Sequence, residues 1–416
     1  MTPPLTEKEL KKQYETYREM NLSLDLTRGK PSSDQLEFSN TLDGILDGDY
    51  FASDGTDTRN YGGLRGISEI RSIGGELLDV DPNLVIAGGN SSLQLMHFVV
   101  DSIMHYGLVE KAFSKEKLVK AICPVPGYDR HFNLTQSFGI EMVTVPMTEF
   151  GPDMEAIEKR VVDQPSCYLL WCVPKFSNPT GCTYSDSVVK QIAELPAKSK
   201  HPLYVLWDNA YAVHDFDSPP IRLANIFDYA ADFGTADKII GFSSTSKISF
   251  AGAGIGFITS SEPVLEAIEK RLGLVTIGPD KVNQLRHAKL LTGRIREHMQ
   301  KHASLVKPKF EAVERGLQNG LGNTNIASWT QPKGGYFVSL DTQPGLAKEV
   351  IDLSRNIGVA LTPAGATFPY NEDPEDKNIR IAPTFASIKE IETAIEALTL
   401  CIRLADLNHG KGRNGA

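Results

Sequence analysis

Residues 203–211, LYVLWDNAY, join a run of strand-forming apolar residues to a carboxylate at its end. The apolar residues are continuous rather than alternating, which is typical of a strand covered on both faces. Six further runs share this character, and they are NLVIAGG (83–89), LVKAICPVPG (118–127), MVTVPM (142–147), CYLLWCVP (167–174), KIIGFSS (238–244) and GIGFITS (254–260). Helical patterns alternate with these runs. The sequence therefore predicts an α/β fold with a mainly parallel sheet of seven strands flanked by helices.

The chain has 416 residues, more than the roughly 250 to 300 that one hydrophobic core usually serves. We expect a large domain over residues 51–305 and a smaller α+β domain over 306–416. Residues 1–50 should form a helix and a crossing segment that belong to the small domain. Thr6 and Glu9 have the spacing of a capping box at the start of that helix. The polar tail from Asn408 is expected to be unstructured.

Composition excludes several classes of function. The net charge of −9 argues against a nucleic-acid surface, which normally carries a basic footprint. The chain has neither an apolar run of about 18 residues nor an export signal, so we expect no membrane contact. Five cysteines without CxxC spacing predict neither a disulfide framework nor a metal site, and they favour a cytoplasmic protein.

Polar residues follow several of the expected strands. Asp208 ends the run at 203–207, Lys247 follows KIIGFSS, and Asn178 lies in the Asn-Pro-Thr-Gly turn after CYLLWCVP. Ligands bind at the carboxyl ends of strands in open α/β sheets. Taken singly, each residue has a simpler interpretation, because a lysine is usually solvated, an aspartate often caps a helix, and Asn-Pro often opens a turn.

A fourth feature lies in AGGNSS (87–92), between a strand and a helix. Backbone N–H groups and hydroxyls at a helix N-terminus form a phosphate cradle, although such glycines also occur in ordinary tight turns. Together the four features suit one ligand that has a phosphate, a ring that needs a carboxylate, a hydroxyl and a carbonyl for a lysine. Pyridoxal 5'-phosphate (PLP) has all four.

The sequence resembles the aspartate aminotransferase superfamily, fold type I of the PLP enzymes, over nearly its whole length. The motifs that carry the resemblance are YGGLRG (61–66), AGGNSS (87–92), PVPGYD (124–129), NPTG (178–181), DNAY (208–211), STSK (244–247), PKGGYF (332–337) and NIRIAP (378–383). Eight ordered motifs are far more specific than any one of them.

The resemblance implies a role for each matching residue. Lys247 would form the Schiff base and move the substrate proton, and Asp208 would pair with the pyridine nitrogen. Tyr211 and Asn178 would hydrogen-bond the 3'-oxygen, and Tyr128 would stack on the ring, unless it is an ordinary half-buried tyrosine. The residues expected around the phosphate are Asn90, Ser91, Ser92, Ser244 and Ser246.

Three further residues match positions that bind substrate or complete the site. Arg380 would bind the substrate α-carboxylate through its planar fork, together with Asn178. The alternative for Arg380 is a surface ion pair with Glu375 or Asp376. Gly29 would approach the substrate from above, where a side chain would obstruct. Tyr61 would reach the phosphate of a neighbouring subunit, which implies a homodimer with shared active sites.

One position departs from the superfamily pattern. Many relatives carry an arginine eight residues after the lysine, where it pairs with the phosphate, whereas this chain has Ile255. Hydroxyls, backbone groups and a helix dipole would then balance the phosphate, or a basic residue elsewhere would do so.

The segments LTRGKPSSDQLEFSN, DNAY and SFAGAGIGF resemble a subgroup of MocR-like and aspartate aminotransferases. Only 25 residues precede Leu26, so we expect no DNA-binding domain. The leading hypothesis is an aminotransferase that moves the amino group of L-aspartate to 2-oxoglutarate. The alternatives are a PLP-dependent lyase of the same fold, an aminotransferase of alanine or aromatic (kynurenine) specificity, and a non-catalytic PLP-binding sensor. Candidates for the cation that binds a distal carboxylate are Arg28, Lys30, Arg65, Arg130 and Arg286.

Overall fold

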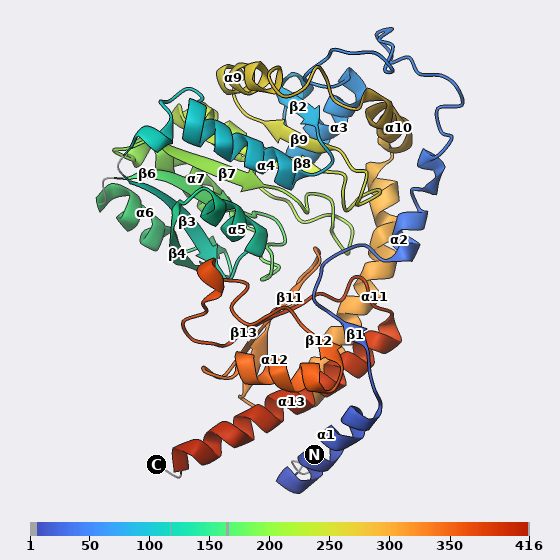
Figure 1. Ribbon diagram of the computed structural model, residues 1–416, viewed down its shortest axis with the longest axis vertical. Helices are drawn as coiled ribbons and strands as arrows, with labels where there is room; N and C mark the ends of the chain where they lie inside the picture. The colour runs from blue at the N-terminus through green and yellow to red at the C-terminus, as the bar shows by residue number, and fades with distance from the viewer. Residues whose placement is uncertain (1–5, 117, 164–165, 415–416) are drawn as a thin grey trace.

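The computed structural model describes residues 6–116, 118–163 and 166–414, and its largest element is an eight-stranded sheet (Figure 1). In spatial order the strands are β2 (Val85–Gly88), β9 (Gly256–Thr259), β8 (Ile239–Ser244), β7 (Leu203–Asp208), β6 (Cys167–Cys172), β3 (Val119–Val125), β4 (Glu141–Thr148) and β5 (Gly151–Pro152). The five strands from β8 to β4 run parallel to one another. β9 pairs antiparallel with both β8 and β2. The α/β class and all seven expected strands are confirmed.

The sheet has one strand more than expected. β5 comprises only two residues and pairs antiparallel with β4, with Met147 opposite Pro152 and Thr148 opposite Gly151. A two-residue strand contributes no apolar run, so hydrophobic pattern alone does not reveal it.

Helices cover both faces of the sheet. They are α3 (Ser68–Leu78), α4 (Ser92–Asp101), α5 (Asp129–Ser137), α6 (Met154–Asp163), α7 (Asp186–Lys198), α8 (Ile226–Phe233), α9 (Glu262–Leu272) and α10 (Lys281–Leu291). On β6, Leu169 and Trp171 pack with α4, α5 and α9, whereas Tyr168 and Leu170 pack with α6, α7 and α8. Because both faces are buried, the strands read as continuous apolar runs.

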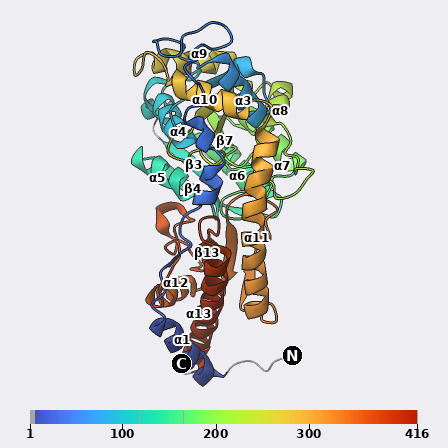
Figure 2. The same ribbon diagram turned by 90° about the vertical axis from the view of Figure 1, so that its right-hand side faces the viewer.

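The lower part of the molecule in Figure 1 contains a smaller set of strands and helices. β10 (Ala327–Trp329), β11 (Val338–Thr342) and β13 (Asn378–Ile381) form an antiparallel sheet, and β1 (Leu24–Asp25) pairs parallel with β12 (Val359–Ala360). The helices here are α1 (Glu7–Glu19), α12 (Ala347–Asn356) and α13 (Ile388–Asn414). The short helix α2 (Ser33–Glu37) lies against α11 (Ile295–Leu321), as both views show (Figures 1 and 2). Single-turn helices lie at 40–42, 82–84, 102–106, 113–115, 236–238 and 369–371.

The long helix α11 runs from the upper to the lower part of the molecule (Figure 2). Ile295 and Met299 belong to the same apolar cluster as the strands β2 and β9. Val306 and Phe310 belong to the cluster formed by β11, β13, α12 and α13. The expected boundary at residues 305–306 falls in this interval, and the division into domains stays a proposal.

The two ends of the chain meet the expectations differently. Helix α1 has the expected capping box, since Glu9 N donates to Thr6 Oγ1 and Thr6 N donates to Glu9 Oε2. The expected unstructured tail from Asn408 is wrong for residues 408–414, because α13 continues to Asn414, and residues 415–416 lie outside the described part of the chain. Asn408 Nδ2 donates to Glu349 Oε1 of α12 at 2.8 Å, a contact that tail composition does not reveal. Among the described helices, none is long and apolar enough to cross a membrane.

Candidate active site

The carboxylate of Asp208 lies buried at the carboxyl end of β7. His131 of α5 donates from Nε2 to Asp208 Oδ2 at 3.1 Å, and its ring stacks on Trp171 with centroids 4.1 Å apart. Asp208 Oδ1 is buried and has no hydrogen-bond partner among the described residues. The helix-cap alternative for Asp208 is wrong, since residues 210–213 form a turn and the next helix begins at Ile226. A buried carboxylate with one unsatisfied oxygen is costly unless a ligand donor completes it.

The side chain of Lys247 follows β8 and lies over Tyr211, with Nζ 4.9 Å from the ring centroid. Burial lowers the pKa of the Lys247 amine, and the negative charge of Asp208 only partly opposes this effect. His214 Nε2 and Tyr336 Oη donate to the main-chain carbonyl of Lys247 at 3.3 and 3.4 Å. These bonds fix the backbone of a lysine whose amine loses its proton more readily than that of an exposed lysine, which favours a role as nucleophile.

Two tyrosines border Asp208 and Lys247. Tyr211 is buried beside Tyr336, with ring centroids 5.8 Å apart. Tyr128 is half-buried and meets the His131 ring edge-on at 4.9 Å. Burial raises the pKa of both phenols well above their usual value, so both retain their protons and can donate hydrogen bonds.

The N-terminus of α4 and the turn before Lys247 lie side by side. Ser246 Oγ donates to the carbonyl of Asn90 at 3.1 Å, and Ser246 N donates to Ser244 Oγ at 3.4 Å. Ser91 caps α4 by accepting from Gln94 N, and Ser92 is the first residue of the helix. The structure therefore brings together the five residues expected around a phosphate, at the positive end of a helix dipole.

The side chain of Ile255 belongs to the apolar core, while its neighbours Gly254 and Gly256 lie against Ser246 and Ser91 of the phosphate cradle. Its side chain is buried in a cluster with Ile248 and Phe257. Its backbone N–H donates to Thr245 Oγ1, and its carbonyl accepts from Thr245 N, both at 2.9 Å. The preceding Gly254 packs so closely that an added Cβ would lie 2.8 Å from Ser246 Oγ. Gly254 and Gly256 thus permit tight packing beside the cradle, whereas a Cβ at Gly252 would meet no neighbouring atom.

Arg380 on β13 is buried and has three polar contacts. Its Nη1 donates to Asp129 Oδ1 at 2.7 Å and to Asn178 Oδ1 at 3.3 Å, and its Nε donates to Thr362 Oγ1 at 3.4 Å. The surface-pair alternative is wrong. Glu375 pairs with Lys377, and Asp376 Oδ1 accepts from Lys348 N.

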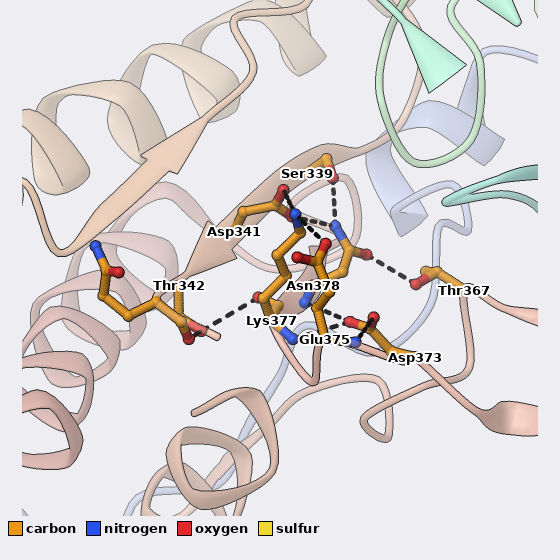
Figure 3. Close-up of polar contacts among 9 residues, drawn as sticks. Ser339, Asp341, Thr342, Thr367, Asp373, Glu375, Lys377 and Asn378 are labelled. Carbon is orange, nitrogen blue, oxygen red and sulfur yellow. Dashed lines mark hydrogen bonds and ion pairs between the residues drawn. The ribbon is translucent and has the colours of Figure 1, made fainter. Parts of the chain in front are cut away.

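A buried polar cluster around Asn378 holds the strand of Arg380 in place (Figure 3). Asn378 Nδ2 donates to Ser339 Oγ and Asp341 Oδ1, while its Oδ1 accepts from Thr367 Oγ1 at 2.7 Å. The carbonyl of Thr367 in turn accepts from Gly127 N at 2.8 Å, next to Tyr128. The cluster therefore ties the strand that carries Arg380 to the loop that carries Tyr128.

Gly29 lies against the ring of Phe337, and that ring lies 5.0 Å from the guanidinium of Arg380. A Cβ at Gly29 would lie 2.4 Å from Phe337 Cζ. No side chain fits here without moving the ring beside Arg380, which is a physical reason for glycine at this position.

Tyr61 stands apart from the buried residues of the site in a single chain. It is 80% exposed, on a loop that Lys281 anchors by donating from Nζ to the carbonyls of Asn60 and Gly62. The other predicted site residues gather around Asp208, Lys247 and Arg380, so Tyr61 is the one predicted residue that this geometry leaves outside.

Comparison with known proteins agrees with this arrangement. The aspartate amino-transferase family matches residues 2–414. The chain belongs to the aspartate aminotransferase family. An aspartate aminotransferase from Corynebacterium glutamicum is 43% identical over 97% of this chain and 94% of its own length. A protein of Mycolicibacterium smegmatis named as a putative aminotransferase is 48% identical, over 94% and 93% of the two chains.

Solved structures of family members have the same fold. The crystal structure of an aspartate transaminase from Corynebacterium glutamicum superposes with a TM-score of 0.94, covering 97% of this chain and 96% of that one at 43% identity. The structure of a putative aminotransferase from Corynebacterium diphtheriae also gives 0.94, covering 97% and 100% at 41% identity. The α/β architecture is therefore that of fold type I aminotransferases.

Aminotransferases of this family depend on PLP, and the residues of this chain fit that cofactor. The unpartnered, buried Asp208 Oδ1 suits a protonated ring nitrogen, which is the donor it lacks. The amine of Lys247, whose pKa is lowered, suits a covalent link to an aldehyde. The serines and the helix N-terminus around Ser91 suit a phosphate.

Four residues of this aspartate aminotransferase family member were missed by sequence reasoning: His131, Trp171, Asp129 and Phe337. A signal for His131 was present, since it follows Tyr128 by three residues and so shares one face at the start of α5. The pair Asp129–Arg380 spans 251 residues and has no local signal.

Proposed function

We propose that this protein is a PLP-dependent transaminase that moves the amino group of L-aspartate to 2-oxoglutarate. The observation that carries the cofactor assignment is the unpartnered oxygen of Asp208 near the half-buried side chain of Lys247, whose amine has a lowered pKa. Aspartate as donor is supported by the 43% identical aspartate aminotransferase and by the aspartate transaminase structure with the same fold.

The cofactor would be held by residues from several strand ends. Lys247 would bind it covalently, Asp208 would hold a proton on its ring nitrogen, and Tyr128 would face the ring. Tyr211 and Asn178 would bond its ring oxygen, while Asn90, Ser91, Ser92, Ser244 and Ser246 would hold the phosphate. When bound, PLP supplies a carbonyl carbon that takes up the amino group and a ring that withdraws electrons from the substrate α-carbon.

Lys247 would also act as the base that moves the substrate proton. A lysine with its usual pKa is protonated at neutral pH and cannot accept a proton. Burial lowers the pKa of Lys247, so a larger share of its amine than of an exposed lysine is neutral and able to take the proton from the substrate α-carbon. The hydrogen bonds from His214 and Tyr336 to the Lys247 carbonyl would hold the base in position during that transfer.

Arg380 would bind the α-carboxylate of both substrates, with Asn178 beside it and Gly29 leaving room above the Phe337 ring. Among the candidates for a distal carboxylate, Arg65 is the least suited. Its Nε and Nη2 donate to Glu269 and Glu262, both at 2.7 Å. Arg28, Lys30, Arg130 and Arg286 stay candidates for that role.

We propose a homodimer in which Tyr61 completes the partner's site. Large apolar side chains are exposed on two neighbouring segments, and they are Phe51, Tyr61, Leu274, Val275 and Ile277. Gly62 N donates to the Ile277 carbonyl at 3.1 Å, which joins the two segments. Clustered exposed apolar residues mark protein interfaces, and an outward tyrosine on such a surface can enter a second copy of the chain.

A reducing compartment, namely the cytoplasm, is also part of the proposal. Cys123, Cys172, Cys182 and Cys401 are free thiols. Burial raises the pKa of each of these thiols, so each resists conversion to the reactive thiolate.

A half-reaction distinguishes the candidate functions. A transaminase given L-aspartate without an oxo acid should release one equivalent of oxaloacetate per subunit and then stop. A lyase would release product continuously, and a sensor would release none. Amino donors of alanine and aromatic type, compared at equal concentration, test the specificity. A larger second-order rate constant for the half-reaction with alanine or with kynurenine than with aspartate would contradict aspartate as the preferred donor.

A further inference from the structure

Asp129 binds the guanidinium group of Arg380, which is the group that a substrate carboxylate would need. It is the first residue of α5, next to Tyr128, and its Oδ1 accepts from Arg380 Nη1 at 2.7 Å. The side chain of Arg380 is 7% exposed and that of Asp129 is 22% exposed, so this is a largely desolvated pair. An ion pair with so little water around it interacts strongly.

The guanidinium of Arg380 has no pair of adjacent N–H donors that is free to bind a second carboxylate. Both hydrogens of Nη1 are taken by Asp129 and Asn178, and the hydrogen of Nε is taken by Thr362. A carboxylate that binds a guanidinium with two bonds uses either Nη1 with Nη2 or Nε with Nη2. An incoming α-carboxylate that binds with two hydrogen bonds must therefore displace at least one of the three partners.

Of the three partners of Arg380, Asp129 is the one to be displaced, because it is the one that carries a negative charge. A retained Asp129 and a bound α-carboxylate would place two negative charges beside one buried positive charge. Asp129 has a second cation within reach, because its Oδ2 lies 3.8 Å from Nε of Arg130, a half-exposed side chain. Asn178 and Thr362 are neutral and cause no such repulsion.

We propose that Asp129 is an internal placeholder for the substrate α-carboxylate, released from Arg380 towards Arg130 when substrate binds. This inference rests on the proposed role of Arg380 as the carboxylate-binding residue. The placeholder keeps a buried arginine neutralised between turnovers. It also selects ligands, because only a molecule that brings its own carboxylate can replace Asp129, whereas an amine without one leaves the ion pair in place.

Calorimetric titration of the holoenzyme with succinate, an unreactive carboxylate, tests the proposal directly. Asp129→Asn removes the competing charge and retains the size of the side chain. We expect succinate to bind about tenfold more tightly to this variant, because one charge-assisted hydrogen bond no longer has to be broken. The KM for amino donor and oxo acid should fall similarly, with kcat little changed. Unchanged or weaker succinate binding would overturn the proposal and make Asp129 a permanent support of Arg380.

Arg130→Ala supplies a second measurement with the opposite sign. When Arg130 is absent, Asp129 has no other cation to bind and should be harder to displace from Arg380. Succinate should therefore bind several-fold more weakly. In the Asp129→Asn background the same Arg130→Ala change should have no effect. A loss of equal size in both backgrounds would mean that Arg130 acts on the ligand itself, which would contradict its role as the acceptor of Asp129.

Asp352→Asn is the matched control, since Asp352 forms an exposed pair with Arg355 at 2.9 Å on α12. It should leave succinate binding unchanged. Succinate binding involves no turnover, so the two proposals fail separately. Tighter binding by Asp129→Asn in a protein without transaminase activity would contradict only the function. Weaker binding in an active transaminase would contradict only the placeholder.

Discussion

His131 and Asp208 form a buried hydrogen bond of 3.1 Å across 77 residues of sequence. His131 stacks on Trp171, so the ring is held while Nε2 engages one carboxylate oxygen. The other oxygen, Oδ1, has no hydrogen-bond partner among the described residues, and in the proposed function it would face the cofactor. His131 thus acts through Asp208, as a positioning residue.

Replacement of His131 by phenylalanine should retain the stacking on Trp171 and remove the hydrogen bond. One oxygen of Asp208 would lose its partner, so we expect the free energy of unfolding of the apoprotein to fall by about 1 to 3 kcal/mol. The cofactor should also dissociate faster, as measured by dialysis. His97→Phe is the control, because His97 lies on the exposed face of α4 and packs against Phe138. Equal behaviour of the two variants would show that His131 does not support Asp208.

Asp208→Asn should leave the fold intact and reduce kcat by about 100-fold or more, because a neutral amide cannot hold a proton on the ring nitrogen. Single-turnover release of oxaloacetate measures this loss without the second substrate. Asp228→Asn, an exposed change on α8, serves as the reference. Near-normal turnover by Asp208→Asn would refute the assigned role.

Two buried histidines should make stability depend on pH. Burial lowers the pKa of His214 and His302 to about 3, whereas the unfolded chain titrates near 6.5. Below pH 6.5 the unfolded state therefore binds more protons than the folded state. Stability is complete above that pH and decreases as the pH falls towards 3.

Between pH 7.5 and 5.5 these two groups together should remove about 3 kcal/mol from the free energy of unfolding. Urea titrations at both pH values measure the difference. His302→Leu should remove about half of the contribution of these two groups. A pH dependence of the same size in that variant would mean that His302 does not titrate as its burial implies.

Ile255→Arg introduces the arginine that the superfamily pattern led us to expect at this position, yet it should harm this protein. The side chain would enter a buried apolar cluster, and an unpaired buried charge should cost about 3 to 5 kcal/mol of unfolding free energy. Ile255→Val should cost only about 0.5 to 1.5 kcal/mol. If the arginine variant were as stable as the parent and bound PLP more tightly, the position would face the phosphate after all.

The fold and the centre of the site were predictable from local sequence. A parallel strand that is buried on both faces has a continuous run of apolar residues in its sequence, as in LYVLW. Asp208, Asn178 and Lys247 each come shortly after such a run, where ligands bind in open α/β sheets. The eighth strand was not predictable, because two residues form no pattern.

Local sequence could not predict the contacts between residues that lie far apart in the chain. Asp129 reads as a good first residue of a helix, and nothing near it indicates Arg380 on β13. His302 on α11 lies 3.1 Å from Nε2 of Gln35, a contact between segments 267 residues apart. Such pairs depend on how the long helix and the N-terminal segment cross, which periodicity does not determine.

The central claim is that Lys247 carries the cofactor, and borohydride reduction of the holoprotein followed by peptide mapping tests it most directly. The account predicts a stable pyridoxyl label on Lys247 and no label in Lys247→Ala. A label on a different lysine, such as the buried Lys175 or Lys281, or no label on the unaltered protein, would contradict it.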